Sequence, residues 1–175
     1  LTSFGENAFY NYAKLESITI PEGTTVIPAF FARNCASLNK VELPPTVTEI
    51  GLGAFAECQA LQAIELPSAL EKIKSMAFTS SGLTAISIPE SVTQLSSSAF
   101  TLCSELTTAN IPPKITTISA SLFAGCEKLK QIMIPETIQT IESRAFHGCY
   151  ALTEIIIPNS VTKIEPAVFE DCISL

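Results

Sequence analysis

Apolar residues recur at fixed offsets along the chain, and residues 38–60 display the pattern most clearly. That stretch, LNKVELPPTVTEIGLGAFAECQA, follows the template L-x-x-V-x-L-P-x-x-V-x-x-I-x-x-x-A-F-x-x-C-x-x. Its first leucine recurs at spacings of 23, 23, 22, 23, 23, 23 and 23 residues, at Leu15, Leu38, Leu61, Leu83, Leu106, Leu129, Leu152 and Leu175. Units of this length bury their apolar faces only by stacking on their neighbours, so the period predicts a solenoid.

Three further repeat positions, which we call columns, recur with the same spacing. A proline follows the first apolar segment of every unit, at Pro21, Pro44, Pro67, Pro89, Pro112, Pro135 and Pro158. A phenylalanine comes eleven residues after most of these prolines, at Phe55, Phe78, Phe100, Phe123, Phe146 and Phe169. Cysteines occupy the position three residues later, at Cys58, Cys103, Cys126, Cys149 and Cys172. Two units depart from the template: Phe31 and Ala32 invert the usual order before Cys35, and the 22-residue unit has Ser80 and Ser81 near the cysteine position.

Each unit is predicted to contain two short strands and one compact turn. The leucine and the apolar residues three and five positions later alternate with polar residues, as in Leu129, Ile132 and Ile134, which indicates a strand that stacks in parallel on its neighbours. Proline then ends the strand, because it has no N–H to donate. Threonine-containing segments such as 47–50 predict a second ladder. The Ala-Phe-x-x-Cys segment is expected to form a single helical or 3₁₀ turn, with the phenylalanines stacked inside.

The period divides the chain into a partial unit, residues 1–14, seven full units and the first residue of another, residue 175. The full units are 15–37, 38–60, 61–82, 83–105, 106–128, 129–151 and 152–174. The partial unit matches the template at three positions, Leu1 with Val47, Phe4 with Ile50 and Phe9 with Phe55. Neither end carries a polar capping repeat, so we expect flanking repeats in a longer parent array.

These motifs resemble those of the BspA-type leucine-rich repeat family. The resemblance rests on L-x-x-I-x-I-P followed by V-x-x-I and A-F-x-x-C, and it covers residues 15–174. It implies a leucine-rich repeat solenoid, a right-handed curved stack of about seven 23-residue coils with short parallel strands on the concave face. Proteins of this family are surface or secreted proteins of host-associated bacteria and some protozoa, implicated in adhesion to host proteins. A cell-surface or secreted location is therefore expected for this chain.

Charge and composition narrow the classes of partner. The net charge is −7, with only ten Lys and Arg residues, and these are scattered. Nucleic acids and anionic membrane surfaces require clustered basic residues, so neither is expected as a partner. The chain is 47% hydrophobic, yet no apolar run approaches the roughly 18 residues that span a bilayer, so no membrane insertion is expected.

The sequence offers little for catalysis, metals or cofactors. The six cysteines share one column that also accepts Ser and Tyr, which favours free, buried thiols; disulfides between adjacent coils are the geometric alternative. His147 is the only histidine, so neither a zinc site nor a catalytic set is expected. Glu42 and Glu65, near Glu16, occupy outward positions that indicate a solvated acidic face rather than a calcium site. We therefore expect that the chain is not an enzyme and that it binds no cofactor.

The residue type at the outward strand positions varies from unit to unit while the spacing stays regular, as expected of a recognition surface. Met133 and Ile156 are large apolar residues at outward positions that are mostly polar, and strand alternation directs both outward on adjacent coils. A small apolar centre with a polar rim is typical of a protein-binding site. The predicted binding residues are Lys130, Gln131, Met133, Thr153, Glu154, Ile156, Glu42 and Glu65. The expected function is a protein-binding module of an adhesin that contacts host or matrix proteins through the concave strand face; the alternative is a structural spacer that presents another domain.

Overall fold

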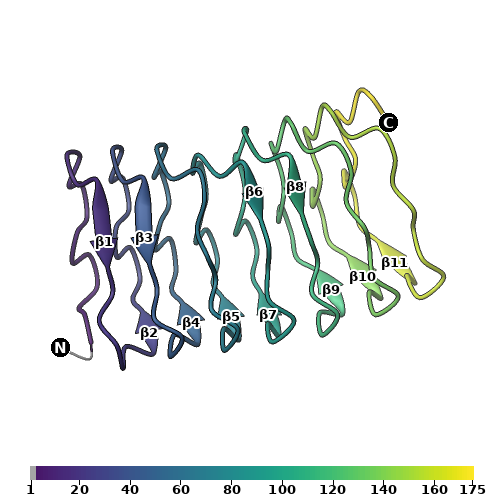
Figure 1. The fold of residues 1–175 in the computed structure, drawn as a ribbon. Coiled ribbons are helices and arrows are strands. Elements are labelled where there is room, and N and C mark those ends of the chain that lie inside the picture. The colour runs from purple at the N-terminus through teal and green to yellow at the C-terminus, as the bar shows by residue number, and fades with distance from the viewer. Residues whose placement is uncertain (1–2) are drawn as a thin grey trace.

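A computed structural model describes residues 3–175 and shows a parallel β-solenoid with coils of about 23 residues (Figure 1). Segments 22 or 23 residues apart lie side by side along the stack. The solenoid and the parallel stacking predicted from the period are therefore confirmed. Leu1, which the period aligns with Val47, lies outside the described residues.

Eleven short strands among residues 3–175 form ladders on two sides of the coil (Figure 1). The first side, which we call the strand wall, consists of the segments that begin two residues after each repeat leucine. Its strands are β1 (Ser17–Thr19), β3 (Lys40–Glu42), β6 (Ala85–Ile86) and β8 (Thr108–Ala109). The other side, the second ladder, contains β2 (Val26–Ile27), β4 (Glu49–Ile50), β5 (Lys72–Ile73), β7 (Gln94–Leu95), β9 (Thr117–Ile118), β10 (Thr140–Ile141) and β11 (Lys163–Ile164).

Side chains alternate in and out along the strand wall, as predicted. In the β1–β3 pair, Ile18 faces Val41 in register and both side chains are buried, while the flanking residues are exposed. β6 pairs with β8, and a single parallel bridge joins Gln131 to Glu154. The second ladder runs as β2-β4-β5-β7 and then as β9-β10-β11. The strand wall is thus the more interrupted of the two ladders.

The Ala-Phe-x-x-Cys segments form a third side, the turn wall, and here one prediction is wrong. Residues 3–175 contain no helix; these segments are reverse turns. Their N–H groups alternate between two kinds of partner. The N–H of Ala56 donates to the Gly53 carbonyl at 3.2 Å within the coil, whereas the N–H of Phe55 donates to the Ala77 carbonyl at 2.8 Å in the next coil. A helix cannot form, because the next coil takes every second donor.

This alternation requires left-handed backbone at two positions of each turn, two residues before and two after the phenylalanine column, which Ala32 occupies in the inverted unit. Their φ angles lie between 54° and 72°. The first column is Asn7, Phe30, Gly53, Met76, Ser98, Ser121, Arg144 and Ala167; the second is Asn11, Asn34, Glu57, Ser80, Leu102, Gly125, Gly148 and Asp171. Left-handed backbone costs most residues roughly 1–2 kcal/mol, so the hydrogen bonds and packing between coils hold the turn in this conformation.

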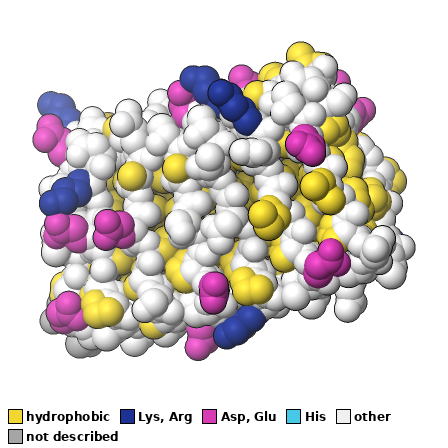
Figure 2. All heavy atoms as spheres, turned by 45° about the vertical axis from the view of Figure 1, so that its right-hand side comes forward, with side chains coloured by type: hydrophobic (Ala, Val, Ile, Leu, Met, Phe, Trp, Pro, Cys, Tyr) yellow, Lys and Arg dark blue, Asp and Glu magenta, His cyan; other side chains and the backbone are white. Residues whose placement is uncertain are grey.

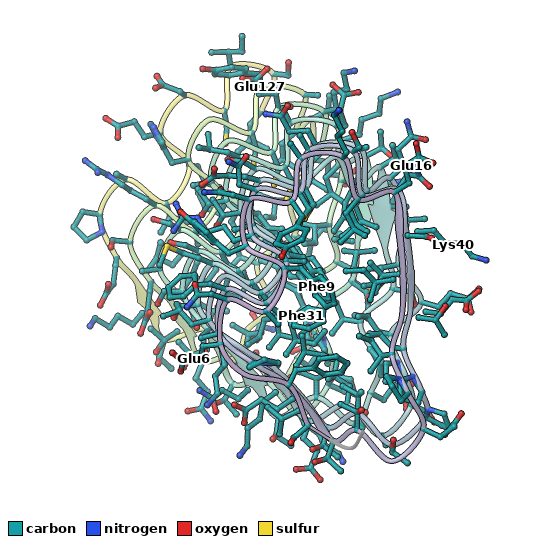
Figure 3. The ribbon with its side chains drawn as sticks, turned by 90° about the vertical axis from the view of Figure 1, so that its left-hand side faces the viewer. Glu6, Phe9, Glu16, Phe31, Lys40 and Glu127 are labelled. Carbon is teal, nitrogen blue, oxygen red and sulfur yellow. The ribbon has the colours of Figure 1, made fainter. Side chains whose placement is uncertain are left out.

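A column of phenylalanine rings fills the interior. From Phe55 to Phe169, successive rings stack with centroids 5.5–5.9 Å apart and interplanar angles of 0–17°. The inverted pair breaks this order, because Phe31 packs edge-on against Phe9 and Phe55. Along the stacking axis, Phe9 and Phe31 lie in the interior and Lys40 projects outward (Figure 3). The predicted phenylalanine spine is confirmed, and each such buried ring contributes roughly 1.5–3 kcal/mol.

The six cysteines are free, and all except the half-buried Cys172 are buried. Each Sγ–H donates to a carbonyl of the preceding coil, as from Cys126 to the Phe100 oxygen at 3.2 Å. Burial raises the pKa of the Cys58 and Cys149 thiols to about 12 and that of Cys103 to about 11. The cysteine column therefore holds protonated thiols that fill space and satisfy carbonyls.

Candidate interaction surface

Met133 and Ile156 are the most exposed apolar side chains of the strand wall. Their exposed fractions are 83% and 72%, while Ile132 and Ile134 on either side of Met133 are each only 6% exposed. Strand alternation therefore directs Met133 outward, because its two neighbours fill the core. The outward orientation predicted for both residues is confirmed.

The bridge between Gln131 and Glu154 sets the register of this region. Met133 and Ile156 each follow the bridge by two residues, so they occupy equivalent positions on adjacent coils. Thr153 reinforces the register, since its N–H donates to the Lys130 carbonyl at 3.1 Å. Exposed polar residues surround the apolar pair: Lys130, Gln131, Thr153 and Glu154. We call these six residues the apolar patch.

The last coil is less well covered than the alternation pattern predicts. Ile155 is half-buried and Ile157 is 36% exposed, although both were expected to point inward. In residues 3–175, no coil packs on the C-terminal side of these residues. Hydrophobic side chains consequently gather over this end of the molecule, to the right in Figure 2.

The opposite end of the strand wall is charged. Lys40 Nζ lies 2.6 Å from a Glu42 carboxylate oxygen, and Thr19 Oγ1 donates to the other oxygen at 2.8 Å. The hydrogen bonds from Lys40 and then Thr19 lower the pKa of Glu42, which is ionised at neutral pH. Glu65 follows on the next coil and is exposed. Glu42 and Glu65 thus lie far from the apolar patch, and the structure does not gather all eight predicted residues into one cluster.

The one histidine lies beside two carboxylates on the turn wall. His147 Nδ1 lies 3.5 Å from a Glu170 carboxylate oxygen and 4.0 Å from an Asp171 oxygen. The His147 side chain is half-buried. Residues 3–175 hold no group of three or more His, Cys, Asp or Glu side chains arranged to bind a metal ion. No helix within that range is long and apolar enough to cross a membrane.

Asn110 has a role that the sequence did not reveal. Its Oδ1 accepts from the Ile88 N–H at 2.6 Å, and its Nδ2 donates to the Ile88 carbonyl at 2.8 Å. The carboxamide thereby replaces two ladder bonds between neighbouring coils. The available signal was an asparagine in a column that otherwise holds residues such as Thr19 and Ser87. An amide carries its donor and its acceptor on two separate atoms, so it can bond the N–H and the C=O of one residue at the same time.

Coils of about 23 residues, a parallel strand wall and a leucine-headed register define a leucine-rich repeat solenoid. The model of the BspA type leucine rich repeat region, in six copies, matches residues 2–129 and 50–175. The chain therefore belongs to the BspA-type leucine-rich repeat family. The comparison with curated proteins finds no match.

Solved structures of similar proteins include three that are at least 27% identical to this chain. A leucine-rich repeat protein of Bacteroides ovatus is 33% identical, with a TM-score of 0.95 over 98% of this chain and 45% of its own. A leucine rich cell surface protein of Faecalibacterium prausnitzii is 30% identical, with a TM-score of 0.61 over 96% of this chain and 60% of its own. A leucine rich repeat protein of T. pallidum is 27% identical, with a TM-score of 0.77 over 97% and 69%. The chain thus spans about half the length of the first two.

Proposed function

We propose that this chain is a non-enzymatic protein-binding module of a cell-surface or secreted adhesin, and that it contacts host or matrix proteins through its strand wall. The supporting observation is the pair Met133 and Ile156, two large apolar side chains exposed in register on a wall whose other outward side chains are polar or alanine. Binding hot spots combine a central apolar contact with a polar rim that excludes water, and the apolar patch has this composition.

Two further facts support this assignment. Solenoids present many side chains on one regular surface, so partner specificity arises from residues that vary while the frame stays fixed. One similar structure belongs to a protein described as a cell surface protein. Fold alone does not define function, so the apolar patch is what the experiment must examine.

The test measures binding of the immobilised 175-residue chain to a panel of purified extracellular-matrix and host-surface proteins. We expect at least one panel protein to bind the wild type, and the variant Met133→Asp/Ile156→Asp to lose at least tenfold in affinity without a lower melting temperature. The matched control is Leu102→Asp, which also places a charge at an exposed large apolar residue but on the turn wall.

Two results would reject the proposal. Equal binding by the wild type and the patch variant would place the contact elsewhere. No binding to any panel protein would instead favour the structural spacer, a scaffold that presents another domain of a longer surface protein.

A further inference from the structure

The outward column of the strand wall changes character along the stack. The residues four positions after each repeat leucine are Thr19, Glu42, Glu65, Ser87, Asn110, Met133 and Ile156. After Thr19, the column carries two acidic side chains, then two uncharged polar ones in the middle and two apolar ones in the C-terminal part. In Figure 2, basic and acidic side chains lie over the left end, and hydrophobic ones, with a few acidic ones among them, gather over the right end.

The strand wall is open between its second and third full coils. Among residues 3–175, no backbone hydrogen bond joins residues 39–43 to residues 63–66. Lys40 and Glu42 already bond to the preceding coil, with Lys40 N–H donating to Glu16 O at 3.2 Å and Glu42 O accepting from Ile20 N–H at 2.9 Å. By strand alternation, the N–H and C=O of Val41 face the following coil and stay unpaired there.

A depression of about 490 Å³ marks this opening, which residues 39–43 and 63–65 line. Its two carboxylates are not equivalent. Glu42 is paired with Lys40, whereas Glu65 takes part in none of the ion pairs of the described residues. The opening therefore offers one uncompensated carboxylate, that of Glu65, together with the unpaired Val41 carbonyl, and two such acceptors suit a lysine or arginine side chain.

The opening and the apolar patch lie on one line. Glu65 and Met133 are three coils apart in the same column. The ~4.8 Å spacing of hydrogen-bonded strands sets a lower bound of about 14 Å between them, because residues 63–66 are not bonded to their neighbours and their spacing is wider. The column between them carries Ser87 and Asn110, flanked by Ala85 and Thr108, so no bulky side chain stands in the path. A single elongated segment of about ten helical residues, or fewer extended ones, spans this distance.

We propose that the strand wall binds an elongated segment of a partner protein that places a basic side chain in the opening beside Glu65 and apolar side chains on Met133 and Ile156. This inference rests on the proposed protein-binding function and specifies the partner's chemistry. The acidic end determines the orientation of the bound segment, and the apolar end contributes most of the affinity, because exposed charge pairs add little while buried apolar contacts add more.

A phage-displayed library of random twelve-residue peptides tests the proposal without a known partner, since twelve residues exceed 14 Å whether helical or extended. Peptides are selected on the wild-type chain and then measured on three variants: Met133→Asp/Ile156→Asp, Glu65→Lys and the control Leu102→Asp. We expect the selected peptides to carry a basic residue apart from an apolar cluster. Both strand-wall variants should lose at least tenfold in affinity, and the control should not.

Added salt distinguishes the two ends, because it screens the contact with Glu65 more than the apolar contact. We expect wild-type affinity to fall with salt and the Glu65→Lys variant to lose this dependence. Peptides that require Met133 and Ile156 but lack basic residues and ignore Glu65 would overturn this inference and leave the proposed function standing. Peptides that bind all variants equally, or a selection that yields no binder, would overturn the inference as well.

Discussion

The phenylalanines are the largest fully buried side chains of the core. Phe123 is fully buried, with ring centroids 5.5 Å from Phe100 and 5.9 Å from Phe146. We predict that Phe123→Ala lowers the free energy of unfolding by about 3–5 kcal/mol, because the cavity opens between two coils that cannot collapse onto it. Chemical denaturation monitored by circular dichroism measures this change. Glu127→Ala, at an exposed position of the same unit, is the control, and equal stability of the two variants would contradict the stacking model.

Gly82 marks the place where the 22-residue unit packs most tightly. A Cβ at this position would come 2.0 Å from the Gln59 carbonyl oxygen, which is backbone and cannot rotate away. We predict that Gly82→Ala destabilises the chain by about 1–3 kcal/mol through overpacking. Gly5→Ala is the matched control, because a Cβ there has no neighbour within 4 Å. A thermal melt of both variants measures the difference, and an unchanged Gly82→Ala melt would show that the coil shifts without cost.

The buried thiols predict a loss of stability at alkaline pH. Desolvation raises the pKa of Cys58 and Cys149 from 9.0 to about 12, so the folded state holds these protons while the unfolded state releases them above about pH 9. The contribution of these thiols to the free energy of unfolding should therefore be constant below pH 9. It should fall as pH rises towards 12, by about 1.4 kcal/mol per pH unit for each such thiol.

Denaturation curves between pH 7 and 10.5, with reductant present, measure this slope. Cys149→Ser removes one titrating group and should reduce the slope by about one proton. A serine hydroxyl fits this part of the core, because Ser81 lies near the cysteine column and contacts Cys103 Sγ. A slope unaffected by the substitution would mean that the thiols do not control the alkaline transition.

At the scale of elements, the three sides of the coil differ in how continuously they are bonded. The turn wall carries backbone bonds across successive coils, such as Phe78 N–H to Ala99 O at 2.9 Å and Phe100 N–H to Leu122 O at 3.1 Å. The strand wall, in contrast, has no backbone bond from residues 63–66 to either neighbouring coil. The turn wall therefore holds the stack together where the strand wall is open.

This difference predicts a contrast in amide hydrogen exchange. We expect the amides of residues 63–66 to exchange at least a hundredfold faster than those of Phe78 and Phe100, because the former are not hydrogen-bonded and exchange without unfolding of the coil. Exchange followed by mass spectrometry at peptide resolution measures both regions in one sample. The amides of β3 are an internal reference on the same wall, and comparable protection of residues 63–66 would show that the ladder closes in solution.

At the scale of the whole molecule, stability resides in contacts between nearest neighbours along the stack. Removing residues 106–128 deletes one complete unit and brings residues 83–105 against residues 129–151. We predict a folded, shorter solenoid, because the new junction presents leucine, isoleucine and phenylalanine columns in the same register. Circular dichroism should show one cooperative melt. The control deletes eleven residues from within that unit, which destroys the register and should unfold the neighbouring coils; equal folding of both deletions would contradict the repeat model.

The sequence by itself determined the period, the two ladders, the buried phenylalanine and cysteine columns and the exposure of Met133 and Ile156. These features follow from local alternation and from a repeat that places like residues above one another, so no distant contact is needed to infer them. The tertiary structure alone decided the reverse turns of the turn wall, the left-handed residues, the Asn110 bridge and the opening beside Glu65. Each depends on which main-chain group of a coil 22 or 23 residues away lies within hydrogen-bond distance, and the path of both coils sets that distance.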